Sequence, residues 1–134
     1  IRFISNACAK AVMDLPITIK QNVFFDYLFI DDLAKITEWF IENNPKDKFY
    51  NVCAGEKHDL LTLAKKVLAV AGKNRDIKIA QNGLGKEYSG DNRRLRKEIP
   101  EVTFTPINDA IGELYGWYAT NKHILNKDLL LEDK

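Results

Sequence analysis

A basic stretch at residues 87–98, EYSGDNRRLRKE, is the first candidate for chemistry, and it follows a glycine-rich turn. It places Arg93, Arg94 and Arg96 close together in the sequence. A guanidinium group presents a planar fork of N–H donors that matches the oxygens of a phosphate, which a lysine ammonium does not. The stretch therefore predicts an anion site at Arg93 and Arg94, although the same residues also fit a solvated helix face.

Asn51 is the second candidate, because its amide interrupts the apolar run FYNVCAG at residues 49–55. We expect a strand over this run, and a polar amide inside an apolar strand costs free energy unless it has a partner. The carboxyl ends of strands in open α/β sheets face ligand clefts. The position of Asn51 therefore predicts a contact with a ligand.

Complete catalytic, cofactor or metal motifs are missing from the sequence: there is no GxGxxG after a first strand, no GxxxxGK[ST], no HExxH and no GxSxG. The GLG at residues 83–85 lacks the third glycine and the helix N-terminus that a pyrophosphate needs, so it indicates a turn. His58 and His123 are far apart and have charged neighbours, which indicates surface residues. We expect no catalytic, cofactor-binding or metal-binding residue in this chain.

Tyr118 and Lys122 form a YxxxK, the spacing by which short-chain dehydrogenases place a lysine one helical turn from a catalytic tyrosine. Here no dinucleotide loop precedes the motif, and no serine stands at the usual distance upstream. We interpret the motif as a coincidence, because Tyr118 continues the apolar face of Ile107, Ala110, Ile111 and Leu114.

Helices alternating with strands must position these residues. Helical spacing of apolar residues predicts helices near residues 5–13, 33–42, 60–71, 93–99 and 107–123. Continuous or alternating apolar runs predict strands near residues 16–20, 23–30, 49–55 and 76–80. The pattern indicates an α/β fold, parallel at least in part, with a few strands and about four to five helices. Because the strands are few and uneven, we expect the remainder of the sheet to lie elsewhere.

Three aspartates near the second predicted strand have structural explanations. Asp26 is the only charge in the run 23–30, and Asp31 and Asp32 end that run just before a helix. An aspartate at this place can accept hydrogen bonds from the free N–H groups of the first turn and complements the helix dipole. We expect Asp31 and Asp32 to cap the helix and to have no catalytic role.

Other helix ends are marked by local signals. Asp59 is expected to cap the helix at 60–71, and Gly72 is expected to end it. Thr105 and Pro106 predict a helix start, with a hydroxyl cap and proline at the first position. The charged residues 124–134 are expected to form a loose tail.

Composition places the chain among globular proteins, since its 134 residues are 46% hydrophobic and 29% charged. A net charge of +1 provides no broad field for nucleic acid or an anionic membrane. No apolar run approaches the about 18 residues of a membrane span, and residues 1–13 lack the arrangement of a signal peptide. We expect a cytoplasmic protein with reduced Cys8 and Cys53, and one that is part of a longer chain because it begins inside a helical pattern.

Four segments in order resemble motifs of the NAD-dependent epimerase/dehydratase family, extended short-chain dehydrogenases/reductases that act on nucleotide-diphosphate sugars. FDYLFIDDLA at 25–34 is similar to the family's RD(Y/F)(L/I)(H/Y)VDDL, and FYNVCAGE at 49–56 is similar to YN(I/V)GxGE. DNRRLRKEIPEVTFTP at 91–106 resembles DxxKxxxxLGWxP, with Asp91 and Arg94 at the D and K positions. LYGWYATN at 114–121 resembles xxxxWYxxN. The resemblance covers nearly the whole chain.

This resemblance implies that residues 1–134 form a single C-terminal substrate-binding region of a longer, Rossmann-type enzyme. The glycine-rich loop and the catalytic Ser/Thr and YxxxK would lie in a missing N-terminal domain. NAD or NADP would then be the cofactor of the parent protein, and this chain alone would bind none and would be inactive. The implied partner is a nucleotide-diphosphate sugar, and the implied reaction is hydride transfer with a tyrosine as acid/base.

Two positions depart from the family pattern. Phe25 stands where the family has an arginine that often contacts the diphosphate, and Phe29 stands where it has histidine or tyrosine. We therefore expect Lys20, Arg93 or Arg94 to supply the positive charge instead.

The sequence also allows two other interpretations of the chain. A non-catalytic relative could keep the fold as a binding or regulatory module. An unrelated small α/β domain would instead be a compact monomer without an exposed sheet edge. If the chain is instead a part of a longer enzyme, we expect exposed apolar surface and self-association or a homo-oligomer.

Overall fold

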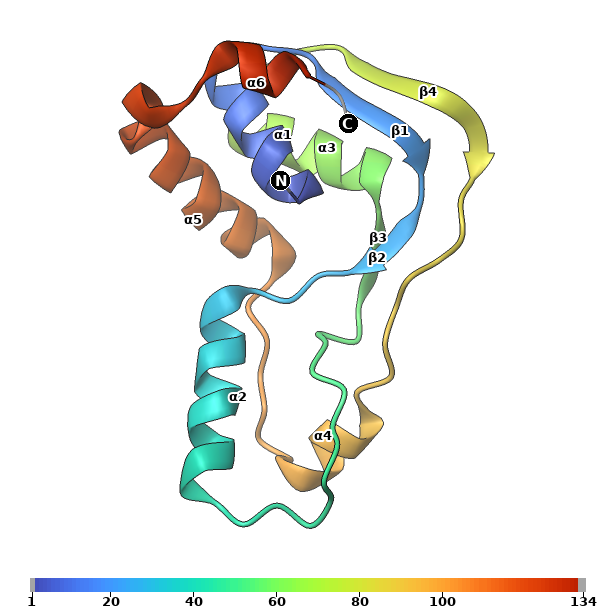
Figure 1. Cartoon of the computed structure of the whole chain (residues 1–134), viewed down its shortest axis with the longest axis vertical. Coiled ribbons are helices and arrows are strands. Elements are labelled where there is room, and N and C mark those ends of the chain that lie inside the picture. Colours follow the sequence, from blue (N-terminus) through green and yellow to red (C-terminus); the bar gives the residue numbers. More distant parts are fainter. Residues whose placement is uncertain (1, 133–134) are drawn as a thin grey trace.

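The structure is a computed structural model that describes residues 2–132, and these residues form helices and short strands in alternation. The helices and strands are α1 (Phe3–Val12), β1 (Ile17–Asn22), β2 (Phe24–Asp26), α2 (Ile30–Glu42), β3 (Lys57–Asp59), α3 (Leu60–Val70), β4 (Ile77–Leu84), α4 (Arg93–Glu98), α5 (Ile107–Thr120), the 3-10 helix η1 (Lys122–Ile124) and α6 (Lys127–Leu131). Figure 1 shows two regions, an upper one with α1, α3, α5, β1 and β4, and a lower one with α2 and α4.

The strands form two small sheets, one in the upper region and one between the two regions (Figure 1). Strands β1 and β4 pair in parallel, from Ile17 opposite Ile77 to Asn22 opposite Leu84, with a register shift near the end. Strands β2 and β3 pair antiparallel, with Phe24 opposite Asp59. The prediction of an α/β fold that is parallel in part is confirmed.

The main core lies between β1 and the helices α1, α3 and α5 (Figure 1). Apolar residues recur every three or four positions along α3, so one face of that helix turns toward the core. Small residues on α1 leave room for the neighbouring helices to approach. The side chains with no exposed surface in this core are Ala7, Cys8, Ala11, Ile17, Leu63, Ala64 and Val67.

A second, smaller core holds α2 against α4. Its buried residues are Ile36, Leu95 and Ile99. Partly buried aromatic rings surround them, and the rings of Phe40 and Tyr50 lie 4.9 Å apart. The lower region therefore has few fully buried side chains of its own.

Two predicted strands are corrected by the structure. The run 23–30 forms a strand only at Phe24–Asp26, and α2 already begins at Ile30. The run 49–55 forms no strand at all. The N–H groups of Ala54 and Gly55 donate to the Asp26 carboxylate, at 3.0 and 2.9 Å. The Asp26 carboxylate thus accepts the backbone hydrogen bonds that a neighbouring strand would otherwise accept.

The predicted caps of α2 and α5 are wrong, and one contact explains both. Phe29 and Pro106 occupy the N-cap positions, and neither helix has a side-chain cap. Asp32 is buried, and its carboxylate accepts hydrogen bonds from the N–H of Thr105 at 2.7 Å and from its hydroxyl at 2.8 Å. Asp31 is exposed in the first turn, where only its charge complements the helix dipole.

The capping prediction at α3 is confirmed, since Asp59 accepts a hydrogen bond from the N–H of Thr62 at 3.0 Å. The tail differs from the expectation of a loose segment over 124–134. Residues 127–131 form α6, and Leu130 packs with Ala9 and Leu15. Residues 133 and 134 lie outside the described part of the chain.

The outer edge of the sheet is exposed. Residues 78–84 of β4 are all exposed, including Leu84 at 62%. Other large apolar side chains in water are Ile30, Ile41, Phe49, Tyr88, Trp117, Ile124, Leu129 and Leu131. No helix among residues 2–132 is both long and apolar enough to cross a membrane.

Candidate functional site

An open hollow of about 540 Å³ lies beside α4, and its size is within the usual range of small-molecule sites. It is formed by the loop after α2, by Asp91 just before α4, and by α4 itself. The lining residues are Asp47, Phe49, Asn51, Asp91, Arg93, Arg94 and Lys97. Three of the four residues predicted to bind substrate are thus brought together.

Asn92 joins the walls of this hollow. It is buried, and its Nδ2 donates to the carbonyl oxygen of Cys53 at 2.9 Å. Gly55 has a positive φ of 81°, and a Cβ there would lie 2.7 Å from Nδ2 of Asn92. Only glycine fits this conformation and this close approach. Asn92 and Gly55 therefore hold the segment 49–55 against the start of α4.

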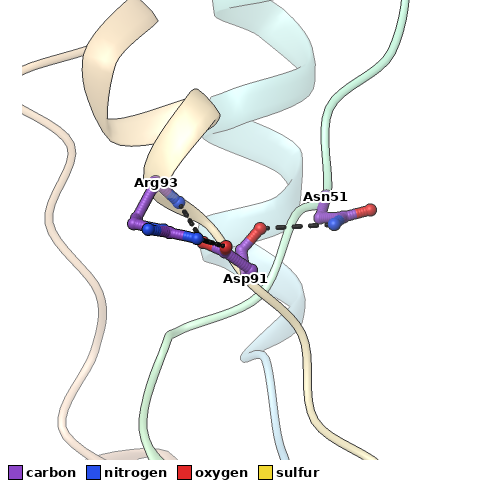
Figure 2. A network of polar contacts seen from close by, with 3 residues as sticks. All are labelled: Asn51, Asp91 and Arg93. Carbon is purple, nitrogen blue, oxygen red and sulfur yellow. Dashed lines mark hydrogen bonds and ion pairs between the residues drawn. The ribbon is translucent and has the colours of Figure 1, made fainter.

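Asn51 makes a second link across the hollow. Its Nδ2 donates to the backbone carbonyl oxygen of Asp91 at 3.2 Å, and Asn51 is exposed. Figure 2 shows that the amide nitrogen points toward Asp91 and that the amide oxygen points away from it. No donor among the described residues is hydrogen-bonded to that oxygen.

Arg93 is held by the carboxylate of Asp91 (Figure 2). Its Nε lies 3.0 and 2.9 Å from the two carboxylate oxygens, and its backbone N–H donates to Oδ1 at 2.9 Å. The hydrogen bonds from the Arg93 side chain lower the pKa of Asp91 from 3.8 to about 2. The same carboxylate raises the pKa of Arg93. Both groups are charged, and one edge of the guanidinium is occupied.

Arg94 is held more loosely. Its Nη1 donates to the carbonyl oxygen of Phe49 at 3.1 Å, and its Nε lies 3.7 Å from a carboxylate oxygen of Asp47. Lys97 lies one turn further along α4. The lining has three cationic side chains and two carboxylates, so the hollow has a local positive excess in a chain of net charge +1.

Two of the basic residues singled out in the sequence lie elsewhere. Arg96 does not line the hollow, and its guanidinium packs over the ring of Phe104 at 5.1 Å. Lys20 is an exposed residue of β1, and Figure 1 shows β1 and α4 in different regions of the molecule. The structure therefore does not place Lys20 with Asn51 and the two arginines.

Sequence reasoning missed three lining residues, Asp47, Phe49 and Lys97. The spacing of Lys97 after Arg93 and Arg94 could have identified it, since residues three and four apart share a helix face. Nothing in the sequence marks Phe49, because it was assigned to a buried strand. Its side chain is 78% exposed.

The other titratable residues singled out in the sequence, Tyr118, His58 and His123, do not line the hollow. Residues 2–132 contain no group of three His, Cys, Asp or Glu side chains that could hold a metal ion. Tyr118 packs against the main core, as its place on the apolar face predicts. The expectation of a surface residue is wrong for His58, whose side chain is only 12% exposed and lies 3.5 Å from Glu56. His123 is exposed, as expected.

Comparisons with known proteins identify the fold. No protein-family model and no curated protein sequence matches the chain. Among solved structures, it is similar to UDP-glucose 4-epimerase from Bifidobacterium longum in complex with NAD+ and UDP, at 20% identity and a TM-score of 0.77, over 92% of this chain and 41% of that one. It is also similar to a GDP-L-fucose synthetase from Naegleria fowleri, at 18% identity and a TM-score of 0.75, over 92% of this chain and 40% of that one.

A third similar structure is dTDP-glucose 4,6-dehydratase from Bacillus anthracis in complex with NAD, at 16% identity and a TM-score of 0.76, over 96% of this chain and 42% of that one. The chain thus spans about two fifths of the length of these proteins. The predicted fold is confirmed: the chain has the architecture of the C-terminal part of extended short-chain dehydrogenases/reductases.

Proposed function

We propose that this chain is the part of an NAD(P)-dependent epimerase, dehydratase or reductase that binds the nucleotide-diphosphate sugar. The likeness of about nine tenths of the chain to three enzymes named for UDP-glucose, GDP-L-fucose and dTDP-glucose is the observation that carries this proposal. The convergence of Asn51, Arg93 and Arg94 on one hollow supports it, because amides and guanidinium groups suit a sugar diphosphate.

In this proposal, cofactor binding and catalysis belong to one part of a parent protein and substrate binding belongs to another. NAD or NADP, the glycine-rich loop and the catalytic tyrosine belong to an N-terminal domain outside these residues, so this chain alone binds no cofactor and turns over no substrate. Two of the three similar structures contain NAD. The exposed edge of β4 and the exposed side chains of Ile30 and Ile41 are surface that this domain or a second copy of the chain would cover. The parent protein is proposed to act in the cytoplasm.

Three aspartates have a supporting role in the proposal. Asp26 holds the backbone of Ala54 and Gly55, and Asp32 holds Thr105, so both fix segments that lead to the hollow. Asp31 contributes only its charge at the start of α2. Lys20 lies outside the site, and we do not assign it a part in substrate binding.

Isothermal titration calorimetry of the 134-residue chain with UDP-, GDP-, dTDP- and CDP-sugars, and with NAD, tests the proposal. We expect one sugar nucleotide to bind and NAD not to bind. Arg94→Ala should then weaken the binding of that sugar nucleotide. The control Arg75→Ala should not, because Arg75 pairs with Asp14 and does not line the hollow. A folded chain that binds none of the four sugar nucleotides would contradict the proposal.

A second candidate is a non-catalytic module with the same fold, and the surroundings of Phe25 favour it. Where the family has an arginine, the ring of Phe25 lies 5.8 Å from the ring of Tyr27 and 6.0 Å from that of Tyr88. These contacts are aromatic and offer no charge to a diphosphate. The sequence encoded upstream of Ile1 separates the two candidates, because a GxxGxxG loop and a YxxxK are expected there only for the enzyme.

A further inference from the structure

We propose that Asn82 is a site of spontaneous deamidation, in which its side chain cyclises onto the backbone nitrogen of Gly83 and water then opens the ring. Asn82 and Gly83 form the single Asn-Gly pair in the sequence. Glycine has no side chain to shield its backbone nitrogen, so an asparagine before glycine reacts more readily than one before a larger residue. The pair lies on β4 and does not line the hollow beside α4, so its modification is independent of the proposed function.

The Asn-Gly pair lies in an irregular part of β4. The register places Gln21 opposite Gln81 and then Asn22 opposite Leu84, so no residue of β1 lies opposite the pair. Extra residues in such a β-bulge are left out of the ladder. Figure 1 shows β4 on the outside of the molecule, with β1 along one side of it. The backbone of the pair can therefore rotate while the residues before it stay paired.

The surroundings of the pair leave room for the reaction. Asn82 and Gly83 are both exposed. Gly83 has a positive φ of 80°, which glycine adopts without steric cost. A Cβ at Gly83 would meet no heavy atom of another described segment within 4 Å. Among residues 2–132, no packed side chain therefore keeps the Asn82 amide away from the Gly83 nitrogen.

The reaction needs only water as a co-reactant. The Gly83 nitrogen forms a bond to Cγ of Asn82, the bond from Cγ to Nδ2 breaks, and Nδ2 leaves as ammonia with the proton that the Gly83 nitrogen gives up. Water then adds to one of the two carbonyl carbons of the succinimide ring, and the bond from that carbon to the nitrogen breaks. Cleavage at Cγ gives aspartate. Cleavage at the main-chain carbonyl carbon gives isoaspartate, in which the backbone runs through the side chain and is one carbon longer.

Isoaspartate at this position should disturb the contacts that follow the bulge. The N–H of Gly85 donates to the carbonyl oxygen of Asn22 at 2.8 Å. The side chain of Asn22 donates to Asp59 at 3.0 Å and accepts from the N–H of Leu61 at 3.1 Å. Asp59 in turn caps α3. A longer backbone at the bulge therefore acts on the first turn of a helix of the main core, whereas aspartate leaves the backbone length unchanged.

Peptide mapping by mass spectrometry tests the proposal on the 134-residue chain, kept at mildly alkaline pH and physiological temperature. We expect a mass gain of about one dalton at Asn82, with isoaspartate in the product. Asn74 is the internal control, because it is exposed in the irregular segment before β4 but is followed by Arg75. Deamidation at Asn82 that is no faster than at Asn74, or that gives no isoaspartate, would overturn the proposal.

The same rate measured in urea separates the effect of the bulge from that of the sequence. A site that reacts only after the ladder opens is slowed in proportion to the closed population, so we expect a rate in the folded chain within about tenfold of the rate in the unfolded chain. A larger difference would overturn the assignment of the bulge as a conformation that permits the reaction.

Two variants test the effect on α3. Asn82→Gln should abolish the modification and keep the fold, because its longer side chain would have to form a less favourable six-membered ring. Asn82→Asp introduces the charge without the longer backbone. We expect the isolated isoaspartate form to lose amide hydrogen-exchange protection at Leu61 and Thr62, whose N–H groups bond to Asn22 and Asp59, and Asn82→Asp to retain it. Equal protection in the two forms would overturn this effect.

Discussion

The two regions of the molecule are held together in different ways. The upper region packs α1, α3 and α5 on β1 around side chains that have no exposed surface, such as Leu63 and Val67. Among residues 2–132, the lower region, which contains the hollow, has only Ile36, Leu95 and Ile99 as buried apolar residues. Its segments are positioned by a set of hydrogen bonds between side chains and backbone groups.

Three of these hydrogen-bonding side chains determine the shape of the lower region. Asp26 fixes Ala54 and Gly55, Asn92 fixes Cys53, and Asp32 fixes Thr105. A packed apolar core tolerates volume-conserving changes better than a buried polar group tolerates the loss of its partner. The upper region should therefore determine whether the chain folds, and the lower region should determine the geometry of the site.

The largest effect is expected in the upper region. Leu63→Ala removes a fully buried side chain of the main core and should lower the free energy of unfolding by about 3 kcal/mol. Urea unfolding followed by circular dichroism measures this change. The control is Leu129→Ala on α6, where the side chain is 60% exposed and the loss should be below about 0.5 kcal/mol. Equal losses at the two positions would contradict the view that the upper core carries the stability.

A smaller effect is expected at the contact between α2 and the start of α5. Asp32→Ala leaves the N–H and the hydroxyl of Thr105 without their acceptor and should cost about 1–3 kcal/mol. Asp31→Ala is the matched control, because Asp31 has the same place in the helix dipole but is exposed and should cost at most about 1 kcal/mol. Unfolding free energies of the two variants under the same conditions give the comparison. If Asp31→Ala costs as much as Asp32→Ala, the helix dipole rather than the buried contact explains the effect.

The upper region could largely be predicted from the sequence. The apolar spacing of α3 and the alternation of β1 and β4 are local patterns, and each corresponds to burial of one face of an element. The cap of α3 could be predicted for the same reason, since Asp59 bonds to Thr62 in the same turn. These features could be predicted because the residues that determine them are close together in the sequence.

The lower region could be predicted only in part. The sequence identified Asn51, Arg93 and Arg94 from their chemical types, and the structure places these three residues at one hollow. It did not predict that Asp32 bonds to Thr105, which is 73 residues away, or that Asp26 takes the place of a neighbouring strand for residues 54 and 55. An apolar run such as 49–55 has the same pattern whether its N–H groups meet a strand or a carboxylate.

The smallest effect concerns ionisation of Asp91 at the hollow. The hydrogen bonds from Arg93 lower the pKa of Asp91 from 3.8 to about 2. Because the folded-state pKa is below the ordinary value, the contact is fully stabilising above pH 3.8 and is lost as the pH falls from 3.8 through about 2. Carbon-13 NMR titration of the Asp91 carboxyl group should therefore give a midpoint near 2, and Arg93→Gln should move it up toward 3.8.

Asp14 is the internal control for this titration, because its pKa is lowered by Lys73 and Arg75 and should not respond to Arg93→Gln. A low midpoint for Asp91 that persists in Arg93→Gln would show that Arg93 does not hold the carboxylate. The guanidinium of Arg93 would then be free for a phosphate, and the two arginines would be equivalent. If the midpoint rises, Arg93 is neutralised by Asp91 at every pH well above 4, and the remaining positive charge in the lining of the hollow comes from Arg94 and Lys97.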